Sequence, residues 1–232
     1  RLVGGRACEY HPGDGLNRPA DVVACRPMAR IVLVIHPVLT TATSPILRRF
    51  RQNRPLQGMT LLYGLFWLWA AAAPLHREDW FLENLLVFIA VAALGATYKR
   101  YPLSDLSYLL VTVFLALHTL GSHYTYAEVP LGSWFGDTFE FGRNHYDRVV
   151  HLVFGLLISY PIWEYFIRHS NIRGFWCYFL PFAVVVASSN FYEFIEWCVA
   201  MIVEPESALK FLGTQGDVFD AQKDTGLAIM GA

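Results

Sequence analysis

The stretch Leu85-Leu-Val-Phe-Ile-Ala-Val-Ala-Ala-Leu94 decides the fold, because it carries no polar side chain. The segment around it, about 81–97, is mainly apolar, and a helix needs about 20 such residues to cross the hydrocarbon core of a bilayer. Backbone groups find no water in hydrocarbon, so a crossing segment folds as a helix that satisfies them internally. The sequence therefore predicts a membrane-spanning helix at this position.

Four further apolar stretches have the length of a span, and another begins near Thr225. We therefore expect an all-α fold, a polytopic transmembrane helix bundle with five full spans and the start of a sixth. The last stretch is too short to cross, so we expect the chain to be cut within its last helix. The expected helices cover about 57–75, 81–97, 106–124, 147–167, 175–203 and 225–232.

The composition agrees with this fold class. Hydrophobic residues make up 55% of the 232 residues and charged residues 16%, whereas soluble domains carry about 25% charged residues. The formal net charge of -1 provides no strongly basic face, so we expect the lipid bilayer as the surroundings and no nucleic-acid partner. The sequence contains no Walker A motif, which disfavours ATP-driven transport by this chain.

Residues 1–50 differ from the rest, since they are rich in Arg, Pro and Gly and show little periodicity. We expect them to form a leader that is disordered or not native to the protein. The transmembrane helical domain is expected to follow at 51–232.

The positive charges of the short loops predict the orientation, because cytoplasmic loops carry an excess of Lys and Arg. Eight such residues fall on the side where the first helix begins, and five fall on the other side. We therefore expect the N-terminal side to lie in the cytoplasm. The loops near 76–80, 125–146 and 204–224 are then expected to face outward.

Five carboxylates late in the chain gather at the outward-facing end of this topology. Glu193 and Glu196 are three residues apart and share a helix face, and Asp217, Asp220 and Asp224 follow at spacings of three and four. Close carboxylates repel one another unless a proton or a cation lies between them. The pattern therefore predicts a divalent metal ion held by these residues. Two simpler interpretations stay open: the glutamates are solvated among the headgroups, and Asp217 and Asp220 cap the last helix.

A second group of ionisable residues opens the fourth expected helix. Asp147, Arg148 and His151 occupy its first turns, and we predict a catalytic role for them. Imidazole can carry a proton near neutral pH, and a guanidinium can bind phosphate through two parallel hydrogen bonds. The alternative is that Asp147 and Arg148 pair with neighbours at the membrane interface. For His118 and His123 a structural role is favoured.

Glu164 and Arg168 lie near the opposite end of the same expected helix. They are four residues apart and share one face, which favours a local ion pair rather than a functional site.

Four stretches occur in the same order as in a known family, over residues 50–232. They are His123-Tyr-Thr-Tyr-Ala-Glu-Val-Pro130, Asn144-His-Tyr-Asp-Arg-Val-Val-His151, Tyr192-Glu-Phe-Ile-Glu-Trp197 and Gly213-Thr-Gln-Gly-Asp-Val-Phe-Asp-Ala-Gln-Lys-Asp224. The chain resembles the YjdF-like bacterial inner-membrane proteins, a family of unknown function. The resemblance implies a multi-pass protein of the bacterial inner (plasma) membrane, but it supplies no reaction.

Three functions are compatible with these residues. The one-sided cluster gives a weak preference to a metal-dependent enzyme that acts on a lipid or lipid-linked phosphate, with His151 as acid–base and Arg148 on the phosphate. A small proton- or cation-coupled transporter is the second, although transport sites usually lie near the bilayer midplane. The third is a non-catalytic membrane scaffold or partner-binding protein. The sequence names neither the substrate nor the oligomeric state.

Overall fold

The computed structural model describes residues 50–170, 172–203 and 205–232. Within this part of the chain every regular element is a helix, which confirms the predicted all-α fold. The expected leader at 1–50 lies outside the described residues, apart from Phe50. The elements are η1 (Phe50–Gln52), α2 (Arg54–Ala72), α3 (Arg77–Thr97), α4 (Asp105–His123), α5 (Pro130–Thr138), α6 (Tyr146–His169), α7 (Trp176–Ala200), α8 (Pro205–Leu212) and α9 (Asp220–Gly231).

Four of the described helices, α3, α4, α6 and α7, are long and apolar enough to cross a membrane. The multi-pass bundle is therefore confirmed, whereas the finer prediction of five full spans and the start of a sixth is not. Helix α2 has 19 residues, but Arg54, Gln57 and Thr60 make its first turns polar. Helix α9 has only 12 residues and begins with a charged turn.

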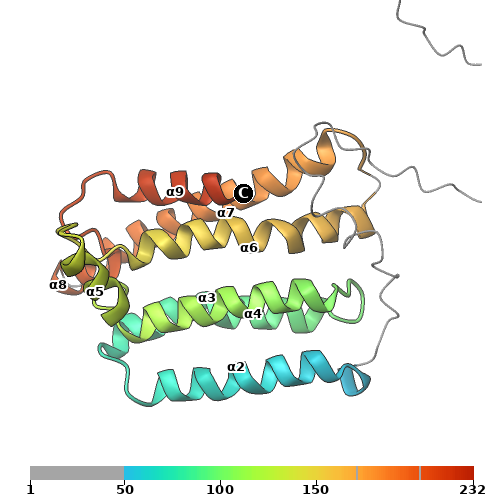
Figure 1. The fold of residues 1–232 in the computed structure, drawn as a ribbon, viewed down its shortest axis with the longest axis horizontal. Coiled ribbons are helices and arrows are strands. Elements are labelled where there is room, and N and C mark those ends of the chain that lie inside the picture. The colour runs from blue at the N-terminus through green and yellow to red at the C-terminus, as the bar shows by residue number, and fades with distance from the viewer. Residues whose placement is uncertain (1–49, 171, 204) are drawn as a thin grey trace, which may run out of the picture.

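The long helices lie side by side along one direction (Figure 1), with α2 at one edge and α7 and α9 at the other. Helix α6 is central, because it packs on α4, α7 and α9. Side chains from α3, α4, α6 and the segment after α4 form the core between them. This core consists of Val87, Phe114, Leu115, Tyr126, Val129, Tyr146 and Val150.

The polarity of the bundle is inverted relative to that of a soluble protein. Ile89 and Leu156 are more than 60% exposed, whereas the Asn84 side chain has no exposed surface. The Asn84 amide accepts from the Trp67 indole N–H at 2.7 Å and donates to the Ser122 hydroxyl at 3.2 Å. Polar side chains that bond across helices, inside an apolar outer surface, are what a bilayer solvent favours.

Helices α6 and α9 touch through their backbones. A Cβ atom added to Gly155 would lie 2.1 Å from the Ala228 carbonyl oxygen, and one added to Gly231 would lie 2.2 Å from the Leu152 carbonyl oxygen. Small residues permit this close approach between membrane helices. The contact holds the first turns of α9 beside the first turns of α6, where the acidic residues lie.

Two of the expected loops contain short helices. Helix α5 lies within the expected loop at 125–146, and α8 lies within the one at 204–224. Both are much shorter than a span, so a search for long apolar runs missed them; α5 starts with Pro130, a favourable first helical residue. Helix α9 also begins at Asp220 rather than near Thr225, so that the last two aspartates lie on helical turns.

Candidate metal centre

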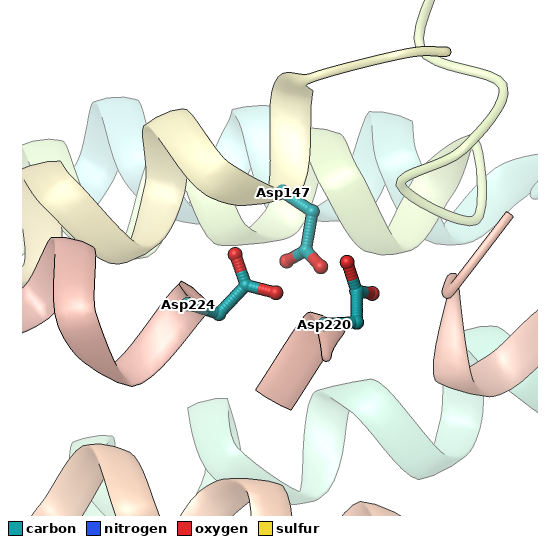
Figure 2. Close-up of side chains that lie close together, drawn as sticks. All are labelled: Asp147, Asp220 and Asp224. Carbon is teal, nitrogen blue, oxygen red and sulfur yellow. The ribbon is translucent and has the colours of Figure 1, made fainter. Parts of the chain in front are cut away.

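Three aspartates converge where α6 and α9 begin. Asp147 comes from α6, and Asp220 and Asp224 come from successive turns of α9. One carboxylate oxygen of each lies within 4.8 Å of the others, and the three side chains point toward one another (Figure 2). Metal–oxygen bonds of about 2.0–2.6 Å allow two ligand atoms of one ion to lie up to about 5 Å apart. The three oxygens can therefore share a single cation.

Asp224 is the most deeply buried member of this trio. Its side chain is 1% exposed, and its Oδ1 atom has no hydrogen-bond partner. An ionised carboxylate is stable in such a place only when it is paired, hydrogen-bonded or bound to a metal. Carboxylate oxygens are ligands that suit Mg²⁺, Mn²⁺ and Ca²⁺. The surroundings of Asp224 therefore fit a hard divalent cation.

Asp217, a predicted ligand, instead lies in a group of basic side chains. It pairs with Arg148, and its Oδ2 atom lies 2.5 Å from Lys223 Nζ and 3.6 Å from Arg143 Nη1. The hydrogen bond from Lys223 lowers the pKa of Asp217 to about 2, helped by the Phe219 backbone N–H. Asp217 is thus neutralised by protein groups, and the structure does not bring it into the trio.

Arg143 and Arg148 link this basic group to the trio. Arg143 Nη1 donates to Asp220 Oδ1 at 2.7 Å, and Arg148 Nη2 reaches the same oxygen at 3.4 Å. Three of their buried nitrogens, Arg143 Nε and Nη2 and Arg148 Nε, have no partner. Guanidinium groups match the geometry of phosphate oxygens. The two arginines therefore offer free donors directly beside the candidate metal ligands.

His145 sits at the edge of this arginine pair. Its Nδ1 atom lies 3.5 Å from Arg148 Nη1. Burial lowers the pKa of His145, and the charges of Arg148 and Arg143 lower it further. Both effects favour the neutral ring, whose Nδ1 atom can accept a hydrogen bond from Arg148.

His151 connects the trio to the two glutamates. Its Nε2 atom lies 3.6 Å from Asp147 Oδ1 and 3.2 Å from Glu193 Oε1, and Glu196 follows Glu193 on the next turn of α7. The structure thus places both acidic motifs at one site. Glu193, however, is a partner of the histidine, and both glutamates lie outside the described group of oxygens that can share an ion.

His118 and His123 have the structural surroundings that the sequence favours. His118 Nε2 lies 3.0 Å from the Glu83 carbonyl oxygen, so it must donate there, and Nδ1 then accepts from the Tyr126 hydroxyl at 2.5 Å. His123 Nδ1 lies 2.9 Å from the Ala70 carbonyl oxygen. Each ring joins two segments of the bundle.

Sequence reasoning missed several residues that shape the site. Arg143 was counted only as a loop charge, and Asn144 and Gln215 were not singled out. The Asn144 N–H donates to Gln215 Oε1, and Gln215 Nε2 donates to the Asn144 carbonyl oxygen, both at 2.9 Å. This pair of bonds fixes the segment before α6 to the loop before α9. Asn144 and Gln215 both occur in the motifs shared with the family, and this occurrence was the sequence feature that could have indicated their importance.

Comparisons with known proteins agree with the motif resemblance. A family described as "Predicted membrane protein (DUF2238)" matches residues 55–232. The chain belongs to this family. It is also 38% identical over 157 residues to the inner membrane protein YjdF of Escherichia coli (strain K12), covering 67% of this chain and 75% of that protein. No solved structure matches the chain. Together with its apolar helices, these findings identify a multi-pass inner-membrane protein.

Proposed function

We propose that this protein is a divalent-metal-dependent membrane enzyme that acts on the phosphate group of a lipid or a lipid-linked substrate. The observation that carries the proposal is the buried Asp224 carboxylate, whose unpartnered Oδ1 atom belongs to a side chain that points toward Asp147 and Asp220 (Figure 2). A divalent cation between the three carboxylates supplies the missing partner. Mg²⁺, Mn²⁺ and Ca²⁺ fit a site that offers only oxygen ligands.

The charge balance of the site supports a cation. When all six carboxyl groups of the site are ionised, they exceed its three permanently basic side chains by three negative charges. One divalent ion offsets two of them. The acids are Asp147, Glu193, Glu196, Asp217, Asp220 and Asp224, and the bases are Arg143, Arg148 and Lys223.

The arginines support phosphate as the group acted upon. Asp220 contacts both guanidinium groups and is also one of the proposed ligands. An anion bound at the metal therefore lies close to Arg143 and Arg148, whose free N–H groups can donate to its oxygens. Metal and arginine together stabilise negative charge that develops on phosphate oxygens during reaction.

His151 is the proposed acid–base residue. The carboxylate of Glu193, 3.2 Å from Nε2, can orient the ring and stabilise its protonated form. Glu193 then acts through the histidine rather than on the metal. The excess of Lys and Arg on the opposite side of the membrane favours placing this site at the outer leaflet, with the N-terminal side of the chain in the cytoplasm.

Mn²⁺ binding tests the metal centre, because the electron paramagnetic resonance (EPR) signal of free Mn²⁺ is lost on binding. We expect near-stoichiometric binding by the purified protein in phosphatidylcholine nanodiscs and by Asp137→Asn, which removes an exposed carboxylate of α5. Asp224→Asn and Asp147→Asn should keep their helical circular dichroism and lose the binding. Phosphate esters of lipids and isoprenoids are then screened for turnover with the loaded protein.

Other outcomes point to the other functions. A folded wild-type protein that binds no Mn²⁺, Mg²⁺ or Ca²⁺ would exclude the metal-dependent enzyme. Proton uptake into proteoliposomes that depends on His151 or Glu193 would then support a coupled transporter. Variants that change only stability would support a scaffold.

A further inference from the structure

A continuous row of aromatic rings leads from the edge of the molecule to the arginine pair. The ring centroids of Trp134 and Phe135 are 4.9 Å apart, and those of Phe135 and Phe139 are 5.9 Å apart. Phe139 stacks on Phe141 at 5.6 Å, and Phe141 meets the His145 ring edge-on at 5.4 Å. His145 in turn contacts Arg148. We call the four residues Trp134, Phe135, Phe139 and Phe141 the aromatic row.

The fold turns the aromatic row outward. The opposite side of α5 carries Gly132 and Gly136, which press against the segment before α6: a Cβ atom at Gly132 would lie 1.9 Å from Asn144 Oδ1, and one at Gly136 would lie 2.8 Å from the Arg143 carbonyl oxygen. Asn144 also donates to the Val129 carbonyl oxygen at 2.9 Å. Helix α5 is therefore fixed to the chain that carries Arg143, and the four rings of the aromatic row remain between 44% and 58% exposed.

Apolar side chains also flank the other side of the basic group. Val218 and Phe219 are 84% and 62% exposed, directly before the first aspartate of α9. The charged site is thus bordered by exposed apolar residues from two loops that are far apart in the sequence. Exposure of these apolar side chains to water would be unfavourable. Contiguous exposed apolar patches usually mark contact with another molecule or a membrane.

The membrane is the surface that these exposed apolar residues are placed to contact. Helix α5 connects the end of α4 to the start of α6, and both of these helices are candidate spans. Such a connection leaves and re-enters the membrane at the level where the two spans leave the hydrocarbon. Aromatic side chains favour that depth, and a helix of nine residues can lie in the interface without crossing it.

We propose that the aromatic row lies at the boundary between hydrocarbon and headgroups, and that the substrate of the metal centre is a phosphate-bearing lipid whose chains lie along the row. This inference rests on the proposed function, and it selects a membrane-embedded phosphate over a water-soluble phosphate ester. The rings contact the apolar chains, while the metal and the arginines at the end of the row bind the phosphate.

The depth of the row is measured with a nitroxide label at Phe139→Cys, in protein whose native cysteines are replaced by serine. In phosphatidylcholine nanodiscs this label should collide with oxygen more often than with a water-soluble nickel chelate. A label at Asp137→Cys, an exposed acidic position in the last turn of α5, should show the reverse preference. Free access of the chelate to position 139 would overturn the proposal.

The substrate class is tested through Mn²⁺ affinity. Dioleoyl phosphatidic acid in the disc should raise the affinity of the wild type by about tenfold, within the usual range of coupling between two ligands. The same amount of dissolved glycerol 3-phosphate should have no comparable effect. Nanodiscs that contain the Asp224→Asn variant and the same lipid measure the Mn²⁺ that the lipid itself binds, and this amount is subtracted. The double variant Trp134→Ser/Phe139→Ser should keep the affinity measured without phosphatidic acid and lose the increase.

The two proposals fail in different ways. Wild-type protein that binds no Mn²⁺ in phosphatidylcholine discs overturns the metal centre and with it the lipid substrate. Normal Mn²⁺ binding without an effect of phosphatidic acid, or with an equal effect of glycerol 3-phosphate, overturns the lipid substrate alone. An increase that survives in the double variant overturns the role of the aromatic row.

Discussion

Glu164, near one end of α6, and Asp224, packed beside its other end, are buried to the same degree, with 2% and 1% of their surface exposed. Their partners differ completely. Glu164 accepts from the Ser104 N–H at 2.9 Å and the Ser104 hydroxyl at 2.8 Å, and also from Ser107, while Arg168 Nη2 lies 2.7 Å away. The local ion pair predicted for Glu164 and Arg168 is therefore confirmed as part of a saturated site.

Asp224 has no such partners. Two aspartates stand close to it, and its Oδ1 atom makes no hydrogen bond. The difference shows that burial alone does not separate a carboxylate that the protein satisfies from one that it leaves without partners. What separates them is whether the protein itself satisfies the charge, because a buried charge without a partner is destabilising unless a ligand completes it.

The largest effect is expected at the saturated end. Glu164→Gln leaves Arg168 without its counter-ion and weakens the bonds from Ser104, so the free energy of unfolding should fall by about 3 kcal/mol. Denaturant titration in mixed micelles measures this change. Mn²⁺ binding per folded molecule should stay at the wild-type level. A loss of binding would contradict the idea that Glu164 acts on stability alone.

At Asp224, whose Oδ1 atom lacks a hydrogen-bond partner, replacing the carboxylate by an amide should raise the stability of the protein rather than lower it. Asp224→Asn removes a buried charge that has no partner, so the metal-free protein should gain about 1–3 kcal/mol of stability. The titration is done in the presence of a chelator. In saturating Mn²⁺ the wild type should regain the advantage, because a ligand at 100 times its Kd adds about 2.7 kcal/mol. A destabilised metal-free variant would mean that Asp224 is satisfied in a way that resembles Glu164.

The smallest effect concerns acid. The pKa of Asp217 is lowered from 3.8 to about 2 by Lys223 and its neighbours. A lowered folded-state pKa contributes stability above the unfolded value, and this contribution disappears as the pH falls through the folded value. The wild type should therefore lose stability relative to Asp217→Asn between about pH 4 and pH 2. Thermal denaturation measures this loss. If the melting temperatures of the two proteins change equally across this pH range, the ion-paired role of Asp217 is contradicted.

The long helices could be predicted because uninterrupted apolar runs leave the backbone no alternative in a bilayer. The site was predicted in part, since Asp220, Asp224 and the start of α6 were expected at the same end. The structure keeps Asp217 out of the trio for a definite reason. A spacing of three residues puts Asp217 and Asp220 on one face only when both lie on the same helix. Helix α9 begins at Asp220, so Asp217 lies before it. Asp217 is free to turn toward Lys223 and Arg148.

The part played by Arg143 could not be predicted from spacing. It lies in a connecting segment, where sequence periodicity carries no information on direction. Two glycine contacts on α5 and the paired amide bonds between Asn144 and Gln215 place it. Such contacts join residues about 70 positions apart, as the 71-residue separation of Asn144 and Gln215 illustrates, and only the folded chain reveals them.

The glycine contact between α6 and α9 has a consequence for biogenesis. Two of the three candidate ligands lie on α9, which is synthesised after α6 and α7. The proposed ion-binding group can therefore assemble only once the later helix has docked, with Gly231 against Leu152. Uptake of a cation would then report that the preceding helices have been inserted in the correct order, and a chain with a misplaced helix would remain metal-free.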